Sequence, residues 1–124
     1  MVAEALLCMV LNVYNEARSE PLLGQIAVAE TVLNRIDDPR WPDDACSVIY
    51  QPYQYSWTLD DPGTPTDIVA YHRAKMAVQY ALEHRTTTAT HYHHEDIVPI
   101  WSKHPRMDYL YQIGVHKFYY EDTQ

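Results

Sequence analysis

Residues 22 to 36 carry apolar side chains on almost every side of a helix, and this segment constrains the fold more than any other. Its apolar positions are Leu22, Leu23, Ile26, Ala27, Ala29, Val32, Leu33 and Ile36. A helix with so wide an apolar surface has to be covered by other elements. The sequence therefore predicts a largely buried helix for which Ser19-Glu20-Pro21 supply a cap and a first-turn proline, and which ends at Asp37.

Two more helices and a short ribbon complete the predicted fold. Apolar residues at three- and four-residue steps predict helices from Val2 to Ala17 and from Pro65 to about His84, the second with a capping box of Thr64 and Asp67. β-branched and aromatic residues predict strands over 86–93 and 115–120, paired as an antiparallel ribbon. We expect the stretch 99–111 to be a loop with one helical turn. The predicted fold class is α+β.

Length and charge exclude several kinds of protein. A chain of 124 residues has room for one domain, 1–124, with a sizeable core. Nine Lys and Arg against seventeen Asp and Glu give a net charge of −8, so we expect no nucleic-acid partner. No apolar run approaches the roughly 20 residues that span a bilayer, so we expect no membrane insertion. We also expect a monomer.

The first residues of the chain and its two cysteines indicate in which cellular compartment the protein is made. Ala5 to Val13 is apolar, but Glu4 stands where a signal peptide carries a basic residue. We therefore expect a chain that is made in the cytoplasm without a signal peptide. Cys8 and Cys46 are too few for a disulfide framework, so we expect them to be reduced, with a single bridge as the alternative.

Glu16 is the first candidate for chemistry. It falls in the last turn of the predicted first helix, where the negative end of the macrodipole disfavours a charged carboxylate. Apolar surroundings would raise its pKa further, as a general acid requires near neutral pH. The alternative is a solvated carboxylate paired with a cation such as Arg18.

Glu30 is the second carboxylate to consider, because its helical neighbours are apolar. We expect a buried structural role, with hydrogen bonds to Arg35, a tyrosine or the backbone, and keep a second catalytic carboxylate as the alternative.

The run His91-Tyr92-His93-His94-Glu95-Asp96 is the densest group of potential metal ligands. On a strand, His91 and His93 would share one face, and His116 on a neighbouring strand is a possible third ligand for zinc. No recognised zinc-ligand spacing is present, so we favour histidines that line a cleft and expect neither a metal nor another cofactor.

A long irregular segment, 39–65, is rich in aromatic residues. Loops of this length inside a small domain usually carry function, and aromatic rings can stack on sugars. The alternative for most of these side chains is a hydrophobic lid over the core. Its aromatic residues include Trp41, Tyr50, Tyr53, Tyr55 and Trp57.

The order of several motifs resembles the SleB-like cell-wall hydrolases, which include spore cortex-lytic enzymes and peptidoglycan hydrolases of phages and bacteria. The blocks that carry the resemblance are Asn15-Glu16-Ala17-Arg18-Ser19-Glu20-Pro21, Gly24 to Glu30, Leu33-Asn34-Arg35, Trp41-Pro42-Asp43, Cys46 to Gln51, Gln54-Tyr55-Ser56-Trp57, Thr90 to His93, Val98-Pro99, Trp101, and Ile113-Gly114 with His116 and Phe118-Tyr119. Ser19 departs from the usual Gly of the family. Leu59 stands where many relatives have a Cys, so the disulfide pattern of the family does not transfer to Cys8 and Cys46.

The resemblance implies a lysozyme-like domain that cleaves the β-1,4 bond between N-acetylmuramic acid and N-acetylglucosamine in peptidoglycan glycan strands. It implies Glu16 as catalytic acid/base and the bacterial cell wall as the place of action, with phage endolysins among the possible classes. A lytic transglycosylase, which leaves a 1,6-anhydro ring, needs only this one carboxylate.

A lone general acid requires substrate within about 2.6–3.2 Å, so we expect two segments to form a groove with Glu16 at its floor. One segment is the Gln54–Trp57 loop and the other is the Thr90–His93 strand. The predicted substrate-binding residues are Gln54, Tyr55, Trp57, Thr90, His91, Tyr92 and His93.

Three alternatives remain. A hydrolytic muramidase would use Glu30 as its second carboxylate. A zinc-dependent amidase or peptidase would use His91, His93 and His116. A non-catalytic glycan-binding module would use Tyr55 and Trp57.

Overall fold

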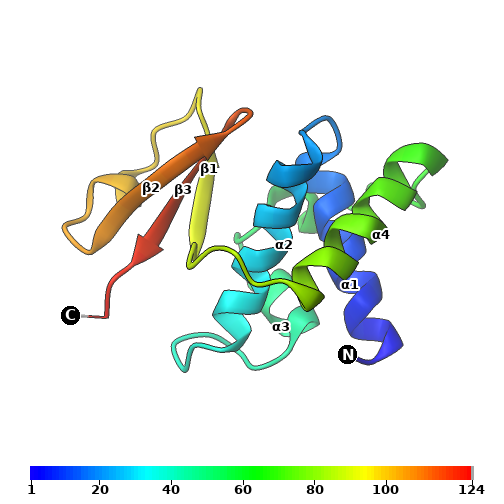
Figure 1. Ribbon diagram of the computed structural model, residues 1–124, viewed down its shortest axis with the longest axis horizontal. Coiled ribbons are helices and arrows are strands. Elements are labelled where there is room, and N and C mark those ends of the chain that lie inside the picture. Colours follow the sequence, from blue (N-terminus) through cyan, green and yellow to red (C-terminus); the bar gives the residue numbers. More distant parts are fainter. Residues whose placement is uncertain (124) are drawn as a thin grey trace.

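The computed structural model describes residues 1–123, and these residues form a helical part and a sheet that lie side by side (Figure 1). The elements in chain order are α1 (Ala3–Ala17), α2 (Leu22–Ile36), α3 (Ala45–Ile49), the 3-10 helix η1 (Ser56–Thr58), α4 (Ile68–Glu83), β1 (His91–His94), the 3-10 helix η2 (Ile100–Lys103), β2 (Met107–Ile113) and β3 (His116–Glu121). The predicted α+β fold class with three long helices is confirmed. Within the described residues, none of the helices combines the length and apolar character needed to cross a membrane.

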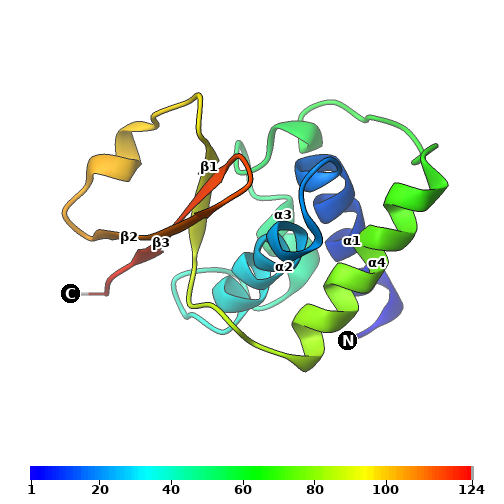
Figure 2. The ribbon, with the colours of Figure 1, turned by 45° about the horizontal axis from the view of Figure 1, so that its top comes forward.

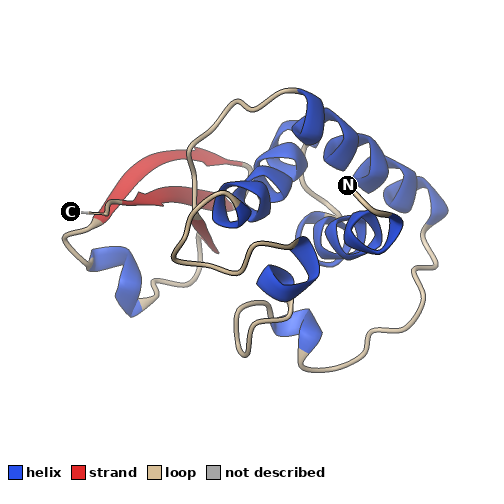
Figure 3. Cartoon of the chain, turned by 90° about the horizontal axis from the view of Figure 1, so that it is seen from below, coloured by secondary structure: helices blue, strands red, loops and turns tan. Residues whose placement is uncertain are grey.

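Helix α2 lies between the other helices and the sheet, as its apolar pattern predicts. It packs on α1, α3 and α4, and in two views the sheet lies on its other side (Figures 1 and 2). Ten consecutive residues, from Gly24 to Leu33, are buried. Seen from below, the long helices gather on one side of the molecule, and the strands lie on the other side with one short helical segment beside them (Figure 3).

Two helix starts differ from the predictions. Helix α4 begins at Ile68 rather than Pro65, because the Asp67 carboxylate caps it by accepting a hydrogen bond from the backbone N–H of Ala70. Helix α2 begins one residue after Pro21 and has no side-chain cap at this end. Thr64 and Asp67 are both capping residue types, and the predicted start of α4 is too early because the helix is capped by the second of them.

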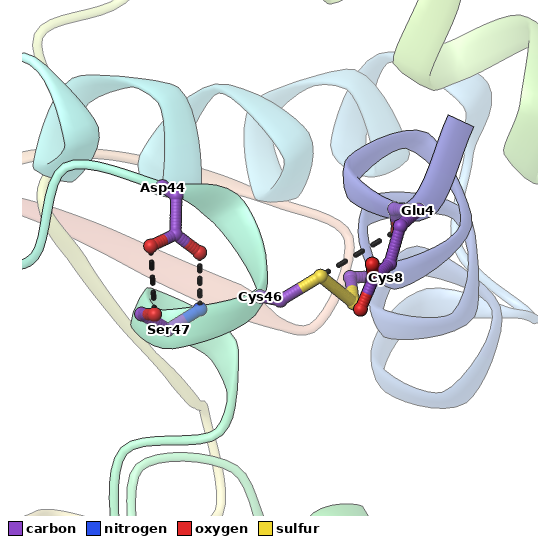
Figure 4. Close-up of a disulfide and its surroundings, with 5 residues drawn as sticks. All are labelled: Glu4, Cys8, Asp44, Cys46 and Ser47. Atoms are coloured by element: carbon purple, nitrogen blue, oxygen red, sulfur yellow. Dashed lines mark hydrogen bonds between the residues drawn. A yellow bond between two sulfur atoms is a disulfide. The ribbon is translucent and has the colours of Figure 1, made fainter. Parts of the chain in front are cut away.

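The expectation of reduced cysteines is wrong in the structure, where Cys8 and Cys46 form a disulfide (Figure 4). Their Cα atoms lie 5.4 Å apart because α3 packs against α1. Asp44 fixes the start of α3 by accepting hydrogen bonds from the backbone N–H and the hydroxyl of Ser47, 2.8 and 2.7 Å long. The bridge thus ties the helix that carries Glu16 to the segment that leads into the Gln54–Trp57 loop.

The sheet has three antiparallel strands in the order β1-β3-β2, so the two-stranded ribbon was an incomplete prediction. The third strand, β2, lies where a loop was expected. Its pairing with β3 contains a bulge between Tyr109 and Tyr111, which interrupts strict alternation. Along β1 the register pairs Tyr92 with Phe118 and His94 with His116.

The predicted first strand is too long at its start, because residues 84–90 run extended along α2 instead of pairing fully with the sheet. Side chains of α2 satisfy the backbone of this segment. The Asn34 amide donates to the carbonyls of Thr87 and Ala89, and Arg35 Nε donates to the carbonyl of Thr90 at 2.7 Å. The segment therefore needs no strand partner over most of its length.

Glu20 connects the start of α2 to the turn between β2 and β3. We find it buried, with its carboxylate accepting a hydrogen bond from the backbone N–H of Val115 at 2.9 Å and lying 3.4 Å from His116 Nδ1. Gly114 has a φ of +56°, and a Cβ there would collide with this carboxylate. Glu20 thus holds the sheet against the helical part.

Candidate active site

Glu16 lies in the last turn of α1, partly buried and close to the end of the helix. Gln25 of α2 donates to the carbonyl of Ala17 at 3.1 Å, so a neighbouring helix satisfies part of the C-terminal end of α1. This packing fixes the direction in which the last turn of α1 presents its side chains. Glu16 therefore has a defined position on a rigid element.

Tyr92 of β1 is the hydrogen-bond partner of Glu16. The Tyr92 hydroxyl donates to Glu16 Oε1 at 2.7 Å. Burial raises the pKa of Glu16 above its usual range, and the hydrogen bond from Tyr92 opposes that rise. Burial, together with the charge of Glu16, raises the pKa of Tyr92 well above its ordinary value, so this hydroxyl keeps its proton and stays a donor.

Two adjoining cavities of about 260 and 330 Å³ open at Glu16, and together we call them the groove. The residues that line both cavities are Glu16, Gln54, Tyr55, Tyr92 and Trp101. They come from α1, the loop before η1, β1 and η2, so the groove lies between the helical part and the sheet. Among the described residues that line it, Glu16 is the only carboxylate.

The Gln54–Trp57 loop forms one wall. Gln54 and Tyr55 line both cavities, and Tyr55 is almost fully buried at 4% exposure. Trp57 lies behind this wall, where its Nε1 donates to Asn12 Oδ1 at 2.8 Å and its ring contacts Tyr50. Asn12 is fully buried one turn before Glu16, so Trp57 anchors the loop to the helix that carries Glu16.

Strand β1 and η2 form the other wall. His91 lines the smaller cavity, His93 lines the larger, and the Trp101 ring lies 5.0 and 5.6 Å from the two imidazole centres. Burial lowers the pKa of His91 to about 3, with Arg35 and Arg40 adding to the effect. His91 is therefore neutral at physiological pH and presents a polar ring without charge.

Most of the predicted site residues meet in the groove. Glu16, Gln54, Tyr55, His91, Tyr92 and His93 all line it. Trp57 and Thr90 do not. Thr90 is 2% exposed, and its hydroxyl accepts a hydrogen bond from the backbone N–H of Glu121.

Eight of the described residues that line the groove are absent from the predicted set, namely Arg35, Tyr53, Ser56, His94, Ile97, Pro99, Trp101 and His116. Tyr53 is highly exposed and has a φ of +61°, a conformation that periodicity does not indicate. The sequence does contain an indication for Arg35, because Arg35 and Glu30 are the two charged residues of a helix that is predicted to be buried.

Glu30 lies away from the groove, in the structural role expected for it. It is fully buried, and its carboxylate accepts hydrogen bonds from the backbone N–H and the hydroxyl of Thr86. The geometry therefore leaves Glu30 no access to a substrate bound at Glu16.

The three histidines of the zinc alternative do not share one face of the sheet. His116 pairs with His94, so it lies on the face of His94 and Tyr92, opposite to His91 and His93. Across the described residues, no group of three or more His, Cys, Asp and Glu side chains is arranged to hold a metal ion. The donor geometry thus gives no support to a site built on His91, His93 and His116.

A larger cavity of about 630 Å³ lies elsewhere, between α1, α4 and the segment that precedes α4. Its lining is mainly apolar and includes Leu7, Leu11, Ile68 and Tyr71. Asp61 is its only carboxylate among the described lining residues, and Glu16 is not part of it. Titratable groups with shifted pKa values gather in the smaller groove, so the groove is the candidate active site.

This chain is similar in sequence to known proteins of one family. Residues 19–119 match the family model described as Cell Wall Hydrolase, a range that begins after Glu16. A spore cortex-lytic enzyme of Halalkalibacterium halodurans is 36% identical over 113 residues, which cover 86% of this chain and 32% of that protein. The Bacillus subtilis spore cortex-lytic enzyme is 42% identical over 48 residues, 39% of this chain and 16% of that protein. The chain thus spans at most about a third of the length of these relatives.

Two solved structures share the fold. The catalytic domain of the germination-specific lytic transglycosylase SleB from Bacillus anthracis superposes with a TM-score of 0.81 at 30% identity, covering 96% of each chain. The catalytic domain of the Bacillus cereus SleB protein gives a TM-score of 0.78 at 30% identity, covering 95% of this chain and 91% of the other. The similarity extends over the helical part and the sheet together, and so over both walls of the groove.

Proposed function

This chain belongs to the cell wall hydrolase family, and we propose that it cleaves the β-1,4 glycosidic bond between N-acetylmuramic acid and N-acetylglucosamine in peptidoglycan. The family is the one that the sequence motifs predicted. The names of the relatives, a spore cortex-lytic enzyme and a lytic transglycosylase, support an enzyme that acts on cell wall. A groove lined by aromatic and polar side chains around one carboxylate supports a carbohydrate substrate.

The observation that carries the proposal is that the described residues of the groove include a single carboxylate. Glu16 has a raised pKa and one strong hydrogen-bond donor, and Glu30 is sealed behind the wall. Hydrolysis by the usual pair of carboxylates needs a second one about 5 to 9 Å away. A lytic transglycosylase needs none, so we propose the transglycosylase outcome.

The proposed reaction moves one proton out of Glu16 and one proton back. Protonated Glu16 donates to the glycosidic oxygen as the bond to C1 of muramic acid breaks. The resulting carboxylate, stabilised by the Tyr92 hydroxyl, then accepts the proton of the muramic acid 6-hydroxyl. The 6-oxygen bonds to C1 and closes the 1,6-anhydro ring, which leaves Glu16 protonated for the next turnover.

The walls of the groove would hold the sugars for this reaction. Trp101 offers apolar ring surface, while Gln54 and the neutral His91 offer hydrogen bonds to hydroxyl and acetamide groups. Tyr92 and His93 complete the wall formed by β1. In this proposal Trp57 acts only by anchoring the loop.

The disulfide supports a place of action outside the cytoplasm, since disulfides persist mainly in oxidising compartments. We propose that the domain works at the bacterial cell wall, where its substrate lies.

Replacement of Glu16 by glutamine tests the proposal. Glu16→Gln keeps the shape of the side chain but cannot give up a proton, so we expect loss of peptidoglycan cleavage with an unchanged unfolding midpoint. Glu4→Gln is the matched control, because it removes an exposed carboxylate from the first turn of the same helix. Cleavage by Glu16→Gln at the rate of the control would contradict the proposal.

A further inference from the structure

Arg35 is a buried cation with no carboxylate partner among the described residues. It is 2% exposed, and none of the ion pairs among the described residues includes it. Its Nε donates to the Thr90 carbonyl, while its Nη1 is buried and has no hydrogen-bond partner within residues 1–123. A buried charge that is only partly satisfied is costly, and this calls for an explanation beyond packing.

The place of Arg35 suggests that explanation, because it lines the smaller cavity together with Glu16, Tyr53, Gln54 and His91. Its bond to the Thr90 carbonyl and its position over the Trp41 ring, 5.1 Å from the ring centre, hold the guanidinium in place. The imidazole of His91 beside it is neutral. Arg35 is therefore the fixed positive charge of the groove.

Arg40, which lies near Arg35, is a cation whose charge is balanced by ion pairs. It lies over the same Trp41 ring at 4.8 Å, but it is exposed and forms ion pairs with Asp38 and Glu121 at 2.9 and 3.1 Å. It is not among the residues that line the cavity. The two arginines thus share an aromatic neighbour and differ in burial and in ion pairing.

A guanidinium forms its strongest hydrogen bonds with carboxylate and carbonyl oxygens, which it can bind with two N–H groups at once. In a polymer of N-acetylglucosamine and N-acetylmuramic acid, both sugars carry an acetamide group. Only muramic acid carries a 3-O-lactyl group, and this ends in a carboxylate or, where a stem peptide is attached, in an amide carbonyl. It is attached to the same sugar ring whose bond at C1 is cleaved.

We propose that Arg35 binds the acyl oxygen of the 3-O-lactyl group of muramic acid, and that it selects the sugar placed next to Glu16. The inference rests on the proposed function, since it assumes a glycan in the groove. It gives the orphaned guanidinium its missing acceptor. It also makes Arg35 a specificity residue that recognises muramic acid, distinct from the acid that cleaves the bond.

Binding to the inactive Glu16→Gln variant tests this proposal without turnover. The ligands for calorimetry are a peptide-free tetrasaccharide of alternating N-acetylglucosamine and N-acetylmuramic acid, its lactyl carboxamide derivative, and the chitin tetrasaccharide that lacks lactyl groups. We expect the first to bind at least about tenfold more tightly than the chitin tetrasaccharide. The carboxamide derivative shows which form of the lactyl group Arg35 binds. If it binds more weakly than the free acid, Arg35 recognises the carboxylate. If the two bind equally, Arg35 recognises the carbonyl oxygen, which is also present where a stem peptide is attached.

Variants of the two arginines separate recognition from structure. Arg35→Gln in the Glu16→Gln background should reduce the preference for muramic acid to about twofold or less, and Arg35→Lys should keep part of it because the charge remains. Arg40→Gln should leave the preference unchanged. The ligand comparison on Glu16→Gln needs no Arg35 variant, so it still decides the matter if Arg35→Gln fails to fold.

Two results would overturn the assignment of Arg35. One is equal affinity of Glu16→Gln for the muramic acid and chitin tetrasaccharides, and the other is a preference that survives in Arg35→Gln. Failure of both sugars to bind would instead contradict the proposed function itself.

Discussion

Removal of the Tyr92 hydroxyl should change both the rate and the pH dependence of cleavage. In Tyr92→Phe the ring remains, but the 2.7 Å hydrogen bond to Glu16 Oε1 is lost. A hydrogen bond to a charged group contributes about 1.5–3 kcal/mol. The bond stabilises the carboxylate that forms as Glu16 gives up its proton, so we expect kcat/KM on its acid plateau to fall roughly 10- to 150-fold.

The sign of the pH effect follows from the same contact. The hydrogen bond from Tyr92 lowers the pKa of Glu16 against the effect of burial, so its removal raises that pKa further. The general acid is active when protonated, and kcat/KM declines as pH rises through the pKa of Glu16. In Tyr92→Phe this decline should move to higher pH.

Initial rates on purified peptidoglycan, measured across pH at low substrate concentration, give both quantities. Tyr111→Phe is the matched control, because Tyr111 lies in the same sheet as Tyr92, its hydroxyl donates to Thr87 Oγ1, and it does not line the groove. A decline that stays in place or moves to lower pH in Tyr92→Phe would refute the assignment of Tyr92 as the donor to a catalytic Glu16.

Three further predictions concern the frame of the site. Replacing both Cys8 and Cys46 by alanine should lower the free energy of unfolding by up to about 4 kcal/mol, from the 38-residue separation of the bridge, and an unchanged midpoint in urea would contradict this. Glu30→Gln should cost about 1–3 kcal/mol of stability, because Thr86 loses a charged acceptor, while the pH profile of cleavage stays unchanged; a shifted profile would bring Glu30 back as a catalytic group. EDTA should leave the rate of turbidity loss of a wall suspension unaltered, and activity that returns only with added zinc would favour the metal-dependent alternative.

The helices and the position of Glu16 could be predicted because they depend on local patterns. Apolar residues at helical spacing gave α1, α2 and α4 to within a few residues, since such a pattern has to be buried on one face. The same spacing put Glu16 in the last turn of α1. The approach of Gln54 and His91 to Glu16 came from the family resemblance and from the needs of a lone general acid, because spacing along the chain does not bring distant segments together.

What could not be predicted depends on contacts between distant segments. The bulge in β2 breaks the alternation by which a strand is recognised. The bridge between Cys8 and Cys46 depends on how α3 packs on α1. Residues 86–89 resemble a strand in composition but use side chains of α2 as their partners, among them Asn34.

The products of cleavage test the central claim most directly. Mass spectrometry of peptidoglycan digested by the unaltered chain, by Glu16→Gln and by Glu4→Gln reports the bond, the reaction and the role of Glu16 together. We expect fragments that end in 1,6-anhydro-N-acetylmuramic acid, lighter by one water than hydrolysed fragments, from the unaltered chain and from Glu4→Gln, and none from Glu16→Gln. Fragments with a reducing muramic acid end would contradict the one-carboxylate mechanism, and anhydro fragments released by Glu16→Gln would contradict the assignment of Glu16 as the acid.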